Sequence, residues 1–375
     1  MTDYDKILTN DERAVYDLRE LYQLYGYQRF KTGKFEEYEL YARNKDFLGS
    51  DGILTFTDAR GRLIALKPDV TLSIAKNADV NPGEVQRFCY NDYVYRLSGD
   101  SGTFREISQT GIECIGDIGS YDVCEVITLA LKSLDLIGEN YILDISHMGI
   151  VRGLTKLLNL PEEAEDSVLQ CIGKKNIHGV RKICRENEVP EEMIERVDSL
   201  ITTYGPIDKV LKELEPLVLN NMMQRAVDEL KVIADVLKKE KLDRCVRFDF
   251  SVVNDMGYYN GVIFQGFIQG IAKAVLSGGR YDNLMKKMNK KCGAIGFSVS
   301  IDALSDLNRK EKDLDVDIVI LDRPGEPLDA LNDAVRCFTE EGLSVSVQKE
   351  VPKNIRYGRL AEIYDGEVRV IETDN

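Results

Sequence analysis

Residues 102–116, GTFREISQTGIECIG, decide the fold. The stretch follows a polar, glycine-rich run, and its residues alternate in type, which is typical of a β-strand. At strand spacing Gln109 and Glu113 project to the same side. An amide and a carboxylate on one face of a sheet could together bind a polar small molecule. A sheet surface that faces solvent fits the same spacing, so both interpretations stay open at this point.

Short apolar runs bounded by turn residues predict further strands on both sides of this stretch. Short turns between several of them, such as Ala59-Arg60-Gly61, indicate antiparallel pairing. Helical periodicity predicts helices at 122–136 and 281–288, and a capping box of Thr9 and Glu12 predicts another helix that ends at Gly26. The predicted strands cover residues 53–56, 62–66, 85–95, 112–115, 141–145, 246–253, 261–268 and 294–301.

The composition changes along the chain in a way that predicts separate parts. Residues 154–242 are rich in Glu, Lys and Leu, and prolines stand near the predicted helix starts. A charged stretch at 308–315 indicates a linker, and a strand–helix–strand unit follows at 316–347. We therefore predict a divided core at 1–153 and 243–307, an inserted helical subdomain at 154–242, and a small α/β tail domain at 308–375.

Charge and cysteine usage limit the possible functions. The 375 residues contain 49 Lys and Arg against 64 Asp and Glu, a formal charge of −15, which disfavours broad binding to nucleic acid. Only His147 and His178 could supply imidazole, so no His-rich metal cluster exists. The eight cysteines form no C-x-x-C pair, and neither a signal peptide nor a membrane span is recognisable. We expect reduced thiols and a cytoplasmic protein.

Three further clusters could carry chemistry. In KPDVT, residues 67–71, a carboxylate and a hydroxyl two residues apart could receive an ammonium group, or could simply cap a helix. In GYYNG, residues 257–261, two tyrosines precede a tight-turn pair, and a plain hairpin is the simpler interpretation. In SGGRYD, residues 277–282, the double glycine permits close backbone approach and could bring an anion near Arg280. This last motif is neither a P-loop nor a dinucleotide fingerprint.

The order and spacing of these clusters resemble the histidyl-tRNA synthetase family. KPDVT is similar to the family's R-P-E-x-T, and residues 102–116 are similar to G-R-Y-R-E-F-x-Q-x-G-x-E-x-x-G. Residues 253–264, 277–284 and 296–304 follow three further family motifs, and residues 26–36 resemble the first, with Gly33 where the family has proline. The resemblance implies an α+β, class II aminoacyl-tRNA synthetase-like fold: an antiparallel sheet flanked by helices, with a helical insertion and a small α/β tail domain.

The resemblance also implies a pocket for histidine. Asp69 and Thr71 would hold the α-amino group, and Arg96 would lie near the carboxylate. Matching the family's motifs assigns eight pocket residues in all: Asp69, Thr71, Arg96, Gln109, Glu113, Tyr258, Tyr259 and Tyr281. Asp69 replaces the usual glutamate and Gly257 replaces an aspartate. These two replacements could change which ligand the pocket binds, or how tightly it binds histidine.

Departures from the family gather at the positions that serve ATP. Ser98 stands where a glutamate contacts adenine, and Thr103, Asn254 and Ala303 stand where the family has arginine. Activation of an amino acid by ATP needs cations on the triphosphate, so loss of three of them would slow that reaction beyond use. The resemblance therefore implies a chain with no catalytic residue, no metal and no cofactor.

A synthetase fold that keeps the amino-acid pocket and loses ATP chemistry resembles the regulatory subunits of ATP phosphoribosyltransferase. That resemblance implies a self-dimer through the core, a hetero-octamer with the short-form catalytic subunit, and histidine feedback on the first step of histidine biosynthesis. A divergent histidine–tRNA ligase and an orphan histidine-binding module are the alternatives. Binding of tRNA is disfavoured, because the tail has one basic cluster, for which a solvated helix face is the simpler interpretation: Lys349, Lys353, Arg356 and Arg359.

Overall fold

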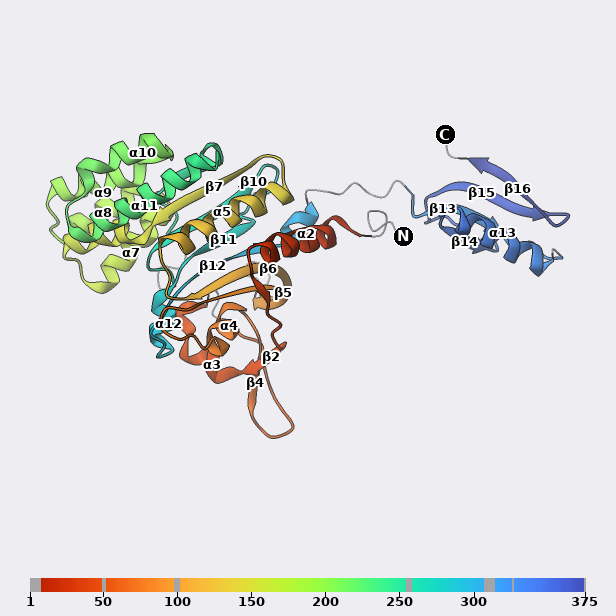
Figure 1. Cartoon of the computed structure of the whole chain (residues 1–375), viewed down its shortest axis with the longest axis horizontal. Coiled ribbons are helices and arrows are strands. Elements are labelled where there is room, and N and C mark those ends of the chain that lie inside the picture. The colour runs from red at the N-terminus through yellow and green to blue at the C-terminus, as the bar shows by residue number, and fades with distance from the viewer. Residues whose placement is uncertain are drawn as a thin grey trace. The chain divides into compact units, whose positions relative to one another are not determined.

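The computed structural model describes residues 8–48, 52–97, 102–253, 258–306, 314–325 and 327–373. The chain divides into two compact units, Met1–Leu307 and Asn308–Asn375. The first unit holds a large sheet, the helices that cover it and a block of further helices (Figure 1). The second unit holds a smaller sheet with one helix among its described residues.

A nine-stranded sheet forms the centre of the first unit, in the order β1-β5-β6-β12-β11-β10-β7-β9-β8. Neighbouring strands run antiparallel except in the pairs β1/β5 and β7/β9. The predicted antiparallel core is therefore confirmed. The strands are β1 (Gln28–Arg29), β5 (Val85–Leu97), β6 (Phe104–Gly116), β7 (Tyr141–His147), β8 (Tyr204–Pro206), β9 (Val246–Asp249), β10 (Val262–Ile268), β11 (Leu276–Arg280) and β12 (Gly293–Ser300).

Strand β6 is an interior strand of this sheet, the third from the β1 edge, between β5 and β12. It pairs with β5 over its whole length, from Leu97 opposite Phe104 to Val85 opposite Gly116. Every residue from position 109 to the end of the strand is buried, because helices or loops cover both faces there. Gln109 and Glu113 are thus not on a solvent-facing surface, and that alternative interpretation is wrong.

Two long helices cover the sheet. Helix α2 (Asn10–Leu24) begins at the predicted capping box, in which Thr9 accepts from the Glu12 N–H and Glu12 accepts from the Thr9 N–H. Helix α5 (Ser120–Ile137) contacts β7, β10, β11 and β12 and is buried along most of its length. Apolar side chains of both helices and of the strands form one continuous core, which stabilises the arrangement through burial.

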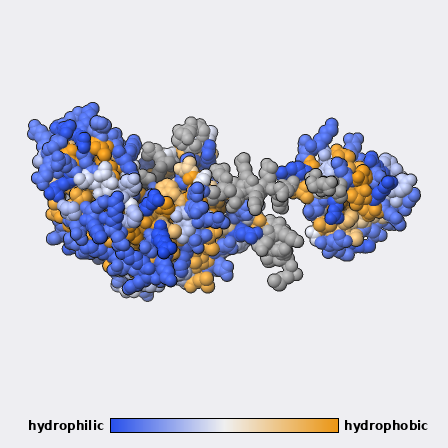
Figure 2. Space-filling view, turned by 90° about the horizontal axis from the view of Figure 1, so that it is seen from above, coloured by the Kyte–Doolittle hydropathy of each residue, from blue (hydrophilic) through white to orange (hydrophobic). Residues whose placement is uncertain are grey.

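The block of helices predicted between the two halves of the core is present (green in Figure 1). Its longest helix, α11, buries an apolar stripe that includes Ala226, Leu230 and Ile233, while its polar residues face outward. Figure 2 shows a mostly hydrophilic surface over this block. The helices are α6 (Met148–Thr155), α7 (Glu162–Gly173), α8 (Ile177–Glu186), α9 (Glu191–Thr202), α10 (Ile207–Leu214) and α11 (Asn221–Lys239).

Two local interpretations are wrong. GYYNG is not the tip of a hairpin, because β9 and β10 lie on opposite sides of β7. The double glycine is not an anion-binding loop, because Gly278 and Gly279 lie within strand β11, between β10 and β12. A Cβ atom on Gly278 would lie 2.4 Å from Cβ of Phe297 and 2.5 Å from the Gly296 carbonyl oxygen. Close packing against the neighbouring strand therefore explains the glycine.

A small sheet and three short helices complete the first unit beside the first half of the core. The sheet has the order β2-β4-β3, and its two outer strands both run antiparallel to β4. These elements are β2 (Phe35–Glu37), β3 (Thr55–Thr57), β4 (Leu63–Leu66), α3 (Tyr38–Arg43), α4 (Thr71–Asn77) and α12 (Asp282–Lys287).

The tail unit contains the predicted strand–helix–strand and two additional strands. Its sheet has the order β14-β13-β15-β16, with only the last pair antiparallel. The basic cluster near its end is not on a helix: Arg359 lies in β15 and the other three residues precede that strand. The elements are β13 (Val316–Leu321), α13 (Leu328–Glu340), β14 (Val345–Gln348), β15 (Tyr357–Tyr364) and β16 (Glu367–Thr373).

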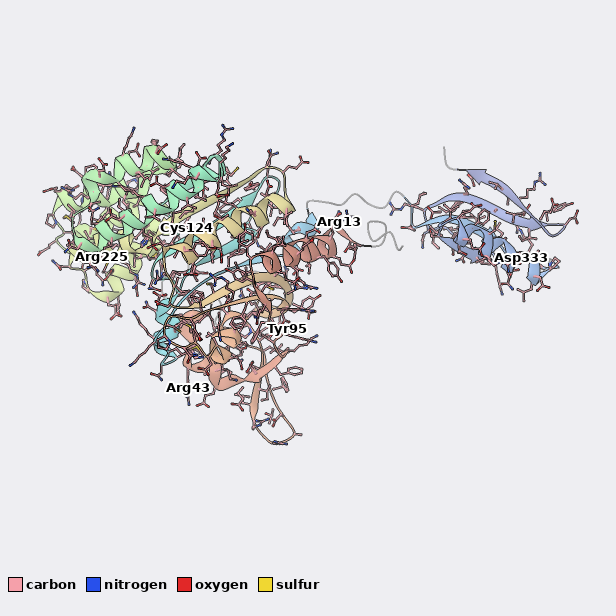
Figure 3. All side chains as sticks on the ribbon, in the orientation of Figure 1. Arg13, Arg43, Tyr95, Cys124, Arg225 and Asp333 are labelled. Atoms are coloured by element: carbon pink, nitrogen blue, oxygen red, sulfur yellow. The ribbon has the colours of Figure 1, made fainter. Side chains whose placement is uncertain are left out.

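All eight cysteines are free thiols, and Cys124, labelled in Figure 3, lies on the buried side of α5. Within the described ranges, no helix combines the length and the apolar character needed to cross a membrane.

We expect Gly278→Ala to lower the free energy of unfolding by about 2–3 kcal/mol, because the added methyl group meets backbone and a buried ring rather than a flexible side chain. Urea unfolding followed by circular dichroism measures this loss. The control is Gly33→Ala, where the nearest atom to a new Cβ is 3.4 Å away. Equal stabilities of the two variants would contradict the close-packing explanation.

Candidate functional site

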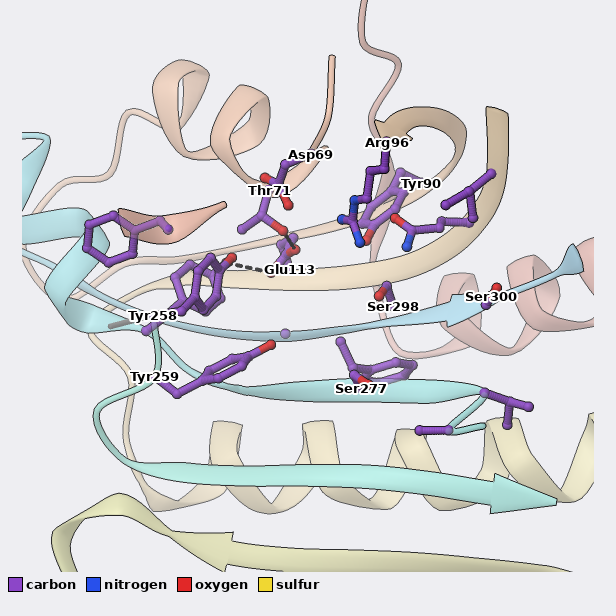
Figure 4. A pocket seen from close by; sticks show the side chains of 18 residues that line it. Asp69, Thr71, Tyr90, Arg96, Glu113, Tyr258, Tyr259, Ser277, Ser298 and Ser300 are labelled. Carbon is purple, nitrogen blue, oxygen red and sulfur yellow. Dashed lines mark hydrogen bonds between the residues drawn. The ribbon is translucent and has the colours of Figure 1, made fainter. Parts of the chain in front are cut away.

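A cavity of about 310 Å³ lies over the middle of the large sheet, lined by strands β5, β6, β11 and β12 and by the start of α4 (Figure 4). All eight residues predicted from the sequence line this one cavity. They come from segments far apart in the chain, and the sheet brings them together. Their individual roles toward a ligand remain predictions.

The carboxyl group of Glu113 occupies the centre of the cavity floor. Its Oε1 accepts a hydrogen bond of 2.5 Å from the Thr71 hydroxyl, and its Oε2 accepts one from the Tyr281 hydroxyl. The side chain is 2% exposed. Strand β12 leaves room for it only because residue 296 is glycine, since a Cβ there would lie 2.0 Å from Oε2.

Burial changes the acidity of this carboxyl group. Loss of hydration raises the pKa of Glu113 from an ordinary value of 4.5 to about 8, against the opposing effect of the hydrogen bonds from Thr71 and Tyr281. The negative charge of nearby Asp69 raises the pKa further. Without a ligand, Glu113 is therefore mostly neutral at pH 7, and it can donate as well as accept a hydrogen bond.

Asp69 combines the two functions that the sequence left open. Its Oδ1 accepts a 2.7 Å hydrogen bond from the Leu72 N–H in the first turn of α4, and its side chain also lines the cavity. Arg96, on β5, donates from Nε to the Pro68 carbonyl at 2.8 Å, which holds the arginine against the same segment. The cavity thus presents a carboxylate and a guanidinium on one wall, as Figure 4 shows.

Lys67 of the same motif does not reach this cavity. Its buried Nζ pairs with Asp92 at 2.5 Å and donates to Thr32. Because an unpaired buried ammonium group would be strongly destabilising, this pair holds the segment in place. Lys67 therefore positions Asp69 and Thr71 rather than contacting a ligand.

The opposite wall is aromatic. The ring of Tyr258 lies 4.7 Å from that of Tyr259, 5.3 Å from that of Tyr281 and 5.8 Å from that of Phe47, measured between centroids. Edge-on and tilted rings at these distances suit a flat ring with polar atoms, because the phenol groups add hydrogen-bond donors.

Sequence reasoning missed several residues that line the cavity. No pattern pointed to Phe47. Tyr90 could have been found, because it pairs with Gly111 between Gln109 and Glu113, and a Cβ at Gly111 would lie 2.8 Å from its hydroxyl oxygen. A glycine between two pocket residues predicts a side chain that crosses from the next strand. Other missed residues are Ile107, Ala274, Val275, Ser277, Phe297, Ser298 and Ser300.

Two of the four positions that serve ATP in the resembling synthetases lie within the described residues. Thr103 is exposed beside the start of β6, and Ala303 lies half-buried in a short 3-10 turn. Neither can supply a cation. Ser98, Asn254 and Gly257 lie outside the described residues.

The cavity has the groups that a small zwitterion with a polar ring requires. Carboxyl groups can receive an ammonium group, Arg96 can pair with a carboxylate, and the tyrosines can contact a ring. Across the part of the chain that the structure describes, no three His, Cys, Asp or Glu side chains are close enough to hold a metal ion.

Comparison with known proteins identifies the family to which this chain belongs. The sequence profile described as Histidyl-tRNA synthetase matches residues 7–304. The chain belongs to the histidyl-tRNA synthetase family. Within this family, an ATP phosphoribosyltransferase regulatory subunit of Oceanobacillus iheyensis is 29% identical over 81% of this chain and 75% of that protein.

Solved structures share the fold. The structure of an ATP phosphoribosyltransferase regulatory subunit/histidyl-tRNA synthetase from Bacillus halodurans C has a TM-score of 0.74 and 26% identity, over 93% of this chain and 90% of that one. A chain of the ATP phosphoribosyl transferase complex from Thermotoga maritima has a TM-score of 0.61 and 21% identity, over 78% of this chain and 97% of that one. The latter similarity concerns the fold alone.

The raised pKa of Glu113 predicts a specific pH dependence. Between pH 4.5 and 8 the folded chain binds a proton at Glu113 that the unfolded chain has lost, so this group makes stability fall as the pH rises. We expect Glu113→Gln to remove this contribution. Relative to the wild type, the variant should gain about 2–3 kcal/mol of unfolding free energy between pH 5.5 and 8.

Urea unfolding at several pH values measures this difference. Glu106→Gln serves as the control, because Glu106 is an exposed carboxylate on the same strand. If the wild type and Glu113→Gln respond to pH in parallel, the buried carboxyl group is ionised and the prediction is wrong.

Proposed function

We infer that this member of the histidyl-tRNA synthetase family is a regulatory subunit of ATP phosphoribosyltransferase. It catalyses nothing by itself, activates the short-form catalytic subunit, and mediates histidine feedback on the first step of histidine biosynthesis. The name of the Oceanobacillus iheyensis relative supports this function, as does the place of the Thermotoga maritima chain in an ATP phosphoribosyl transferase complex.

One observation carries the proposal. The residues that match the family's amino-acid site line a single cavity, while Thr103 and Ala303 stand where the resembling synthetases use arginine. A synthetase needs both halves of this site, because the adenylate forms between the amino acid and ATP. A histidine sensor needs only the first half.

Regulation places a further demand on this cavity. Histidine can inhibit the partner only if it binds more tightly to one state of the complex than to another. The coupling is then reciprocal, so that the catalytic subunit and its substrates also change the affinity for histidine. We propose that the eight residues bind histidine, with Asp69 and Thr71 at the ammonium group, Arg96 near the carboxylate and the tyrosines at the imidazole.

The proposal extends to the organisation of the protein. The synthetase-like core consists of residues 1–153 and 243–307, and two copies of the chain dimerise through it. The helical insertion consists of residues 154–242, and a partial anticodon-binding-like domain consists of residues 308–375. The complex with the catalytic subunit is a hetero-octamer. We place it in the cytoplasm, because its eight free thiols suit a reducing compartment.

Reconstitution tests this function directly. We expect a short-form ATP phosphoribosyltransferase from the same organism to become active when this chain is added, and L-histidine to inhibit the mixture more strongly than the isolated catalytic subunit. Steady-state rates over a titration of this chain measure both effects. A catalytic subunit that is fully active and fully inhibited by histidine alone would exclude the proposal.

A divergent histidine–tRNA ligase is the second candidate, favoured by the retained amino-acid cavity. It predicts histidine-dependent exchange of pyrophosphate into ATP. We expect no exchange from the pure protein, since Thr103 and Ala303 occupy the two family arginine positions that lie within the described residues.

Asp69→Asn tests the assignment of the ammonium site. Asparagine can still accept the hydrogen bond that caps α4, so the fold is retained while the charge is lost. We expect the affinity for L-histidine to fall about tenfold or more, as is typical for a hydrogen bond to a charged group. Isothermal titration calorimetry measures the change.

The control for this variant is Asp79→Asn, which removes an exposed carboxylate shortly after α4. Its affinity should equal that of the wild type. If Asp69→Asn binds histidine as tightly as the control does, Asp69 does not hold the ammonium group.

A further inference from the structure

A carboxylate from the helical block reaches the back of the cavity's aromatic wall. Glu229 lies on α11, and its Oε2 is 2.7 Å from Nε2 of His147, the last residue of β7. The Gly149 N–H donates to Nδ1 of the same ring at 3.0 Å. Because Nδ1 accepts, Nε2 carries the proton, and His147 donates to Glu229.

The other oxygen of the same carboxylate faces Arg280. Oε1 lies 3.9 Å from Nη1 of Arg280, whose Nε donates to Asp282 at 2.9 Å. Asp282 in turn accepts from the Ala294 N–H at 3.0 Å. Glu229 is 26% exposed, and its pKa is lowered: burial would raise it, but the hydrogen bond from His147 and the charge of Arg280 outweigh that effect.

Both partners of Glu229 border the segment that carries the tyrosine pair. The Met148 N–H, next to His147, donates to the Gly261 carbonyl at 2.9 Å. The Asn260 N–H donates to the Arg280 carbonyl, also at 2.9 Å. The segment 258–261 is thus attached at one point beside His147 and at another on Arg280.

Packing restricts the same segment further. The stem of Arg280 lies so close to Gly261 that a Cβ there would meet Cδ of the arginine at 3.0 Å and its Cβ at 3.1 Å. Arg280 also directly precedes Tyr281, whose hydroxyl donates to Glu113 on the cavity floor. A shift of the Arg280 side chain is therefore transmitted to the tyrosines on both sides of it.

We propose that Glu229 is a positioning residue through which the helical block holds Tyr258, Tyr259 and Tyr281 in their binding arrangement. One carboxylate joins the end of β7, the end of β11 and helix α11 behind the cavity. Glu229 contacts no part of the cavity itself, since it is absent from the lining residues. The helical block thereby sets the affinity of the cavity for its ligand. By reciprocity, a ligand bound in the cavity also changes the conformational equilibrium of α11.

This inference rests on the proposed function in naming histidine as the ligand, and its consequences are measurable in the full chain. We expect Glu229→Gln to weaken binding of L-histidine about three- to thirtyfold, the range of couplings transmitted through packed networks. The matched control is Asp228→Asn on the same helix, an exposed carboxylate that accepts from Gln224 at 2.9 Å. It should bind as the wild type does.

A double-mutant cycle separates positioning from a loss of stability. Glu229→Gln and Tyr259→Phe should be non-additive in histidine affinity, because both act through the tyrosine wall. Glu229→Gln and Asp79→Asn, which removes an exposed carboxylate outside the cavity, should be additive. Calorimetry well below the unfolding transition measures the three single and the two double variants. Wild-type affinity of Glu229→Gln, or additivity with Tyr259→Phe, would overturn the inference.

A spectroscopic measurement keeps the inference testable if the wild type binds no histidine, an outcome that would contradict the proposed ligand instead. The chain has no tryptophan and 18 tyrosines, so tyrosine dominates its near-ultraviolet circular dichroism. Glu229→Gln and the shorter Glu229→Asp should alter this spectrum, whereas Asp228→Asn should not. Identical spectra for all three would show that Glu229 does not position the tyrosines.

Discussion

The buried carboxyl group of Glu113 is the interaction on which the site depends. A carboxyl group without water is destabilising unless hydroxyl groups satisfy it, and here Thr71 and Tyr281 do so from two separate segments. This requirement fixes the start of α4 and the end of β11 over the same point of β6. Gly296 on the neighbouring strand supplies the space. The two walls of the cavity therefore face each other because one buried group needs both of them.

This construction suits regulation. The start of α4, the long β5–β6 hairpin and the tyrosine segment all line the cavity, so a ligand that filled it would respond to the relative positions of all three. Behind the tyrosines, the carboxylate of Glu229 continues the connection to the helical block. A synthetase uses such a site to hold a substrate for reaction. In this chain Thr103 and Ala303 stand at two positions where the resembling synthetases use arginine, and binding and release of an amino acid is what the proposed allosteric role requires.

Local patterns predicted much of the fold and of the site, and failed where distant contacts decide. The capping box of Thr9 and Glu12 and the apolar periodicity of α5 act within one helix, so they could be recognised directly. The interpretation of Gly278 as part of an anion-binding loop was wrong, because only the neighbouring strand shows why a glycine is needed there. Phe47 had no local signature, since its place against Tyr258 arises from packing alone.

The sequence by itself predicted the antiparallel core and the helical insertion through turn lengths and periodicity, whereas the eight side chains of the cavity followed from its resemblance to the motifs of the histidyl-tRNA synthetase family. Only the tertiary structure decided that Gln109 and Glu113 face a buried cavity rather than solvent, since the same alternation describes both faces of a strand. The upward shift of the Glu113 pKa and the approach of Glu229 to His147 also depend on the tertiary structure, because burial and long-range contacts, unlike spacing, exist only once the chain has folded.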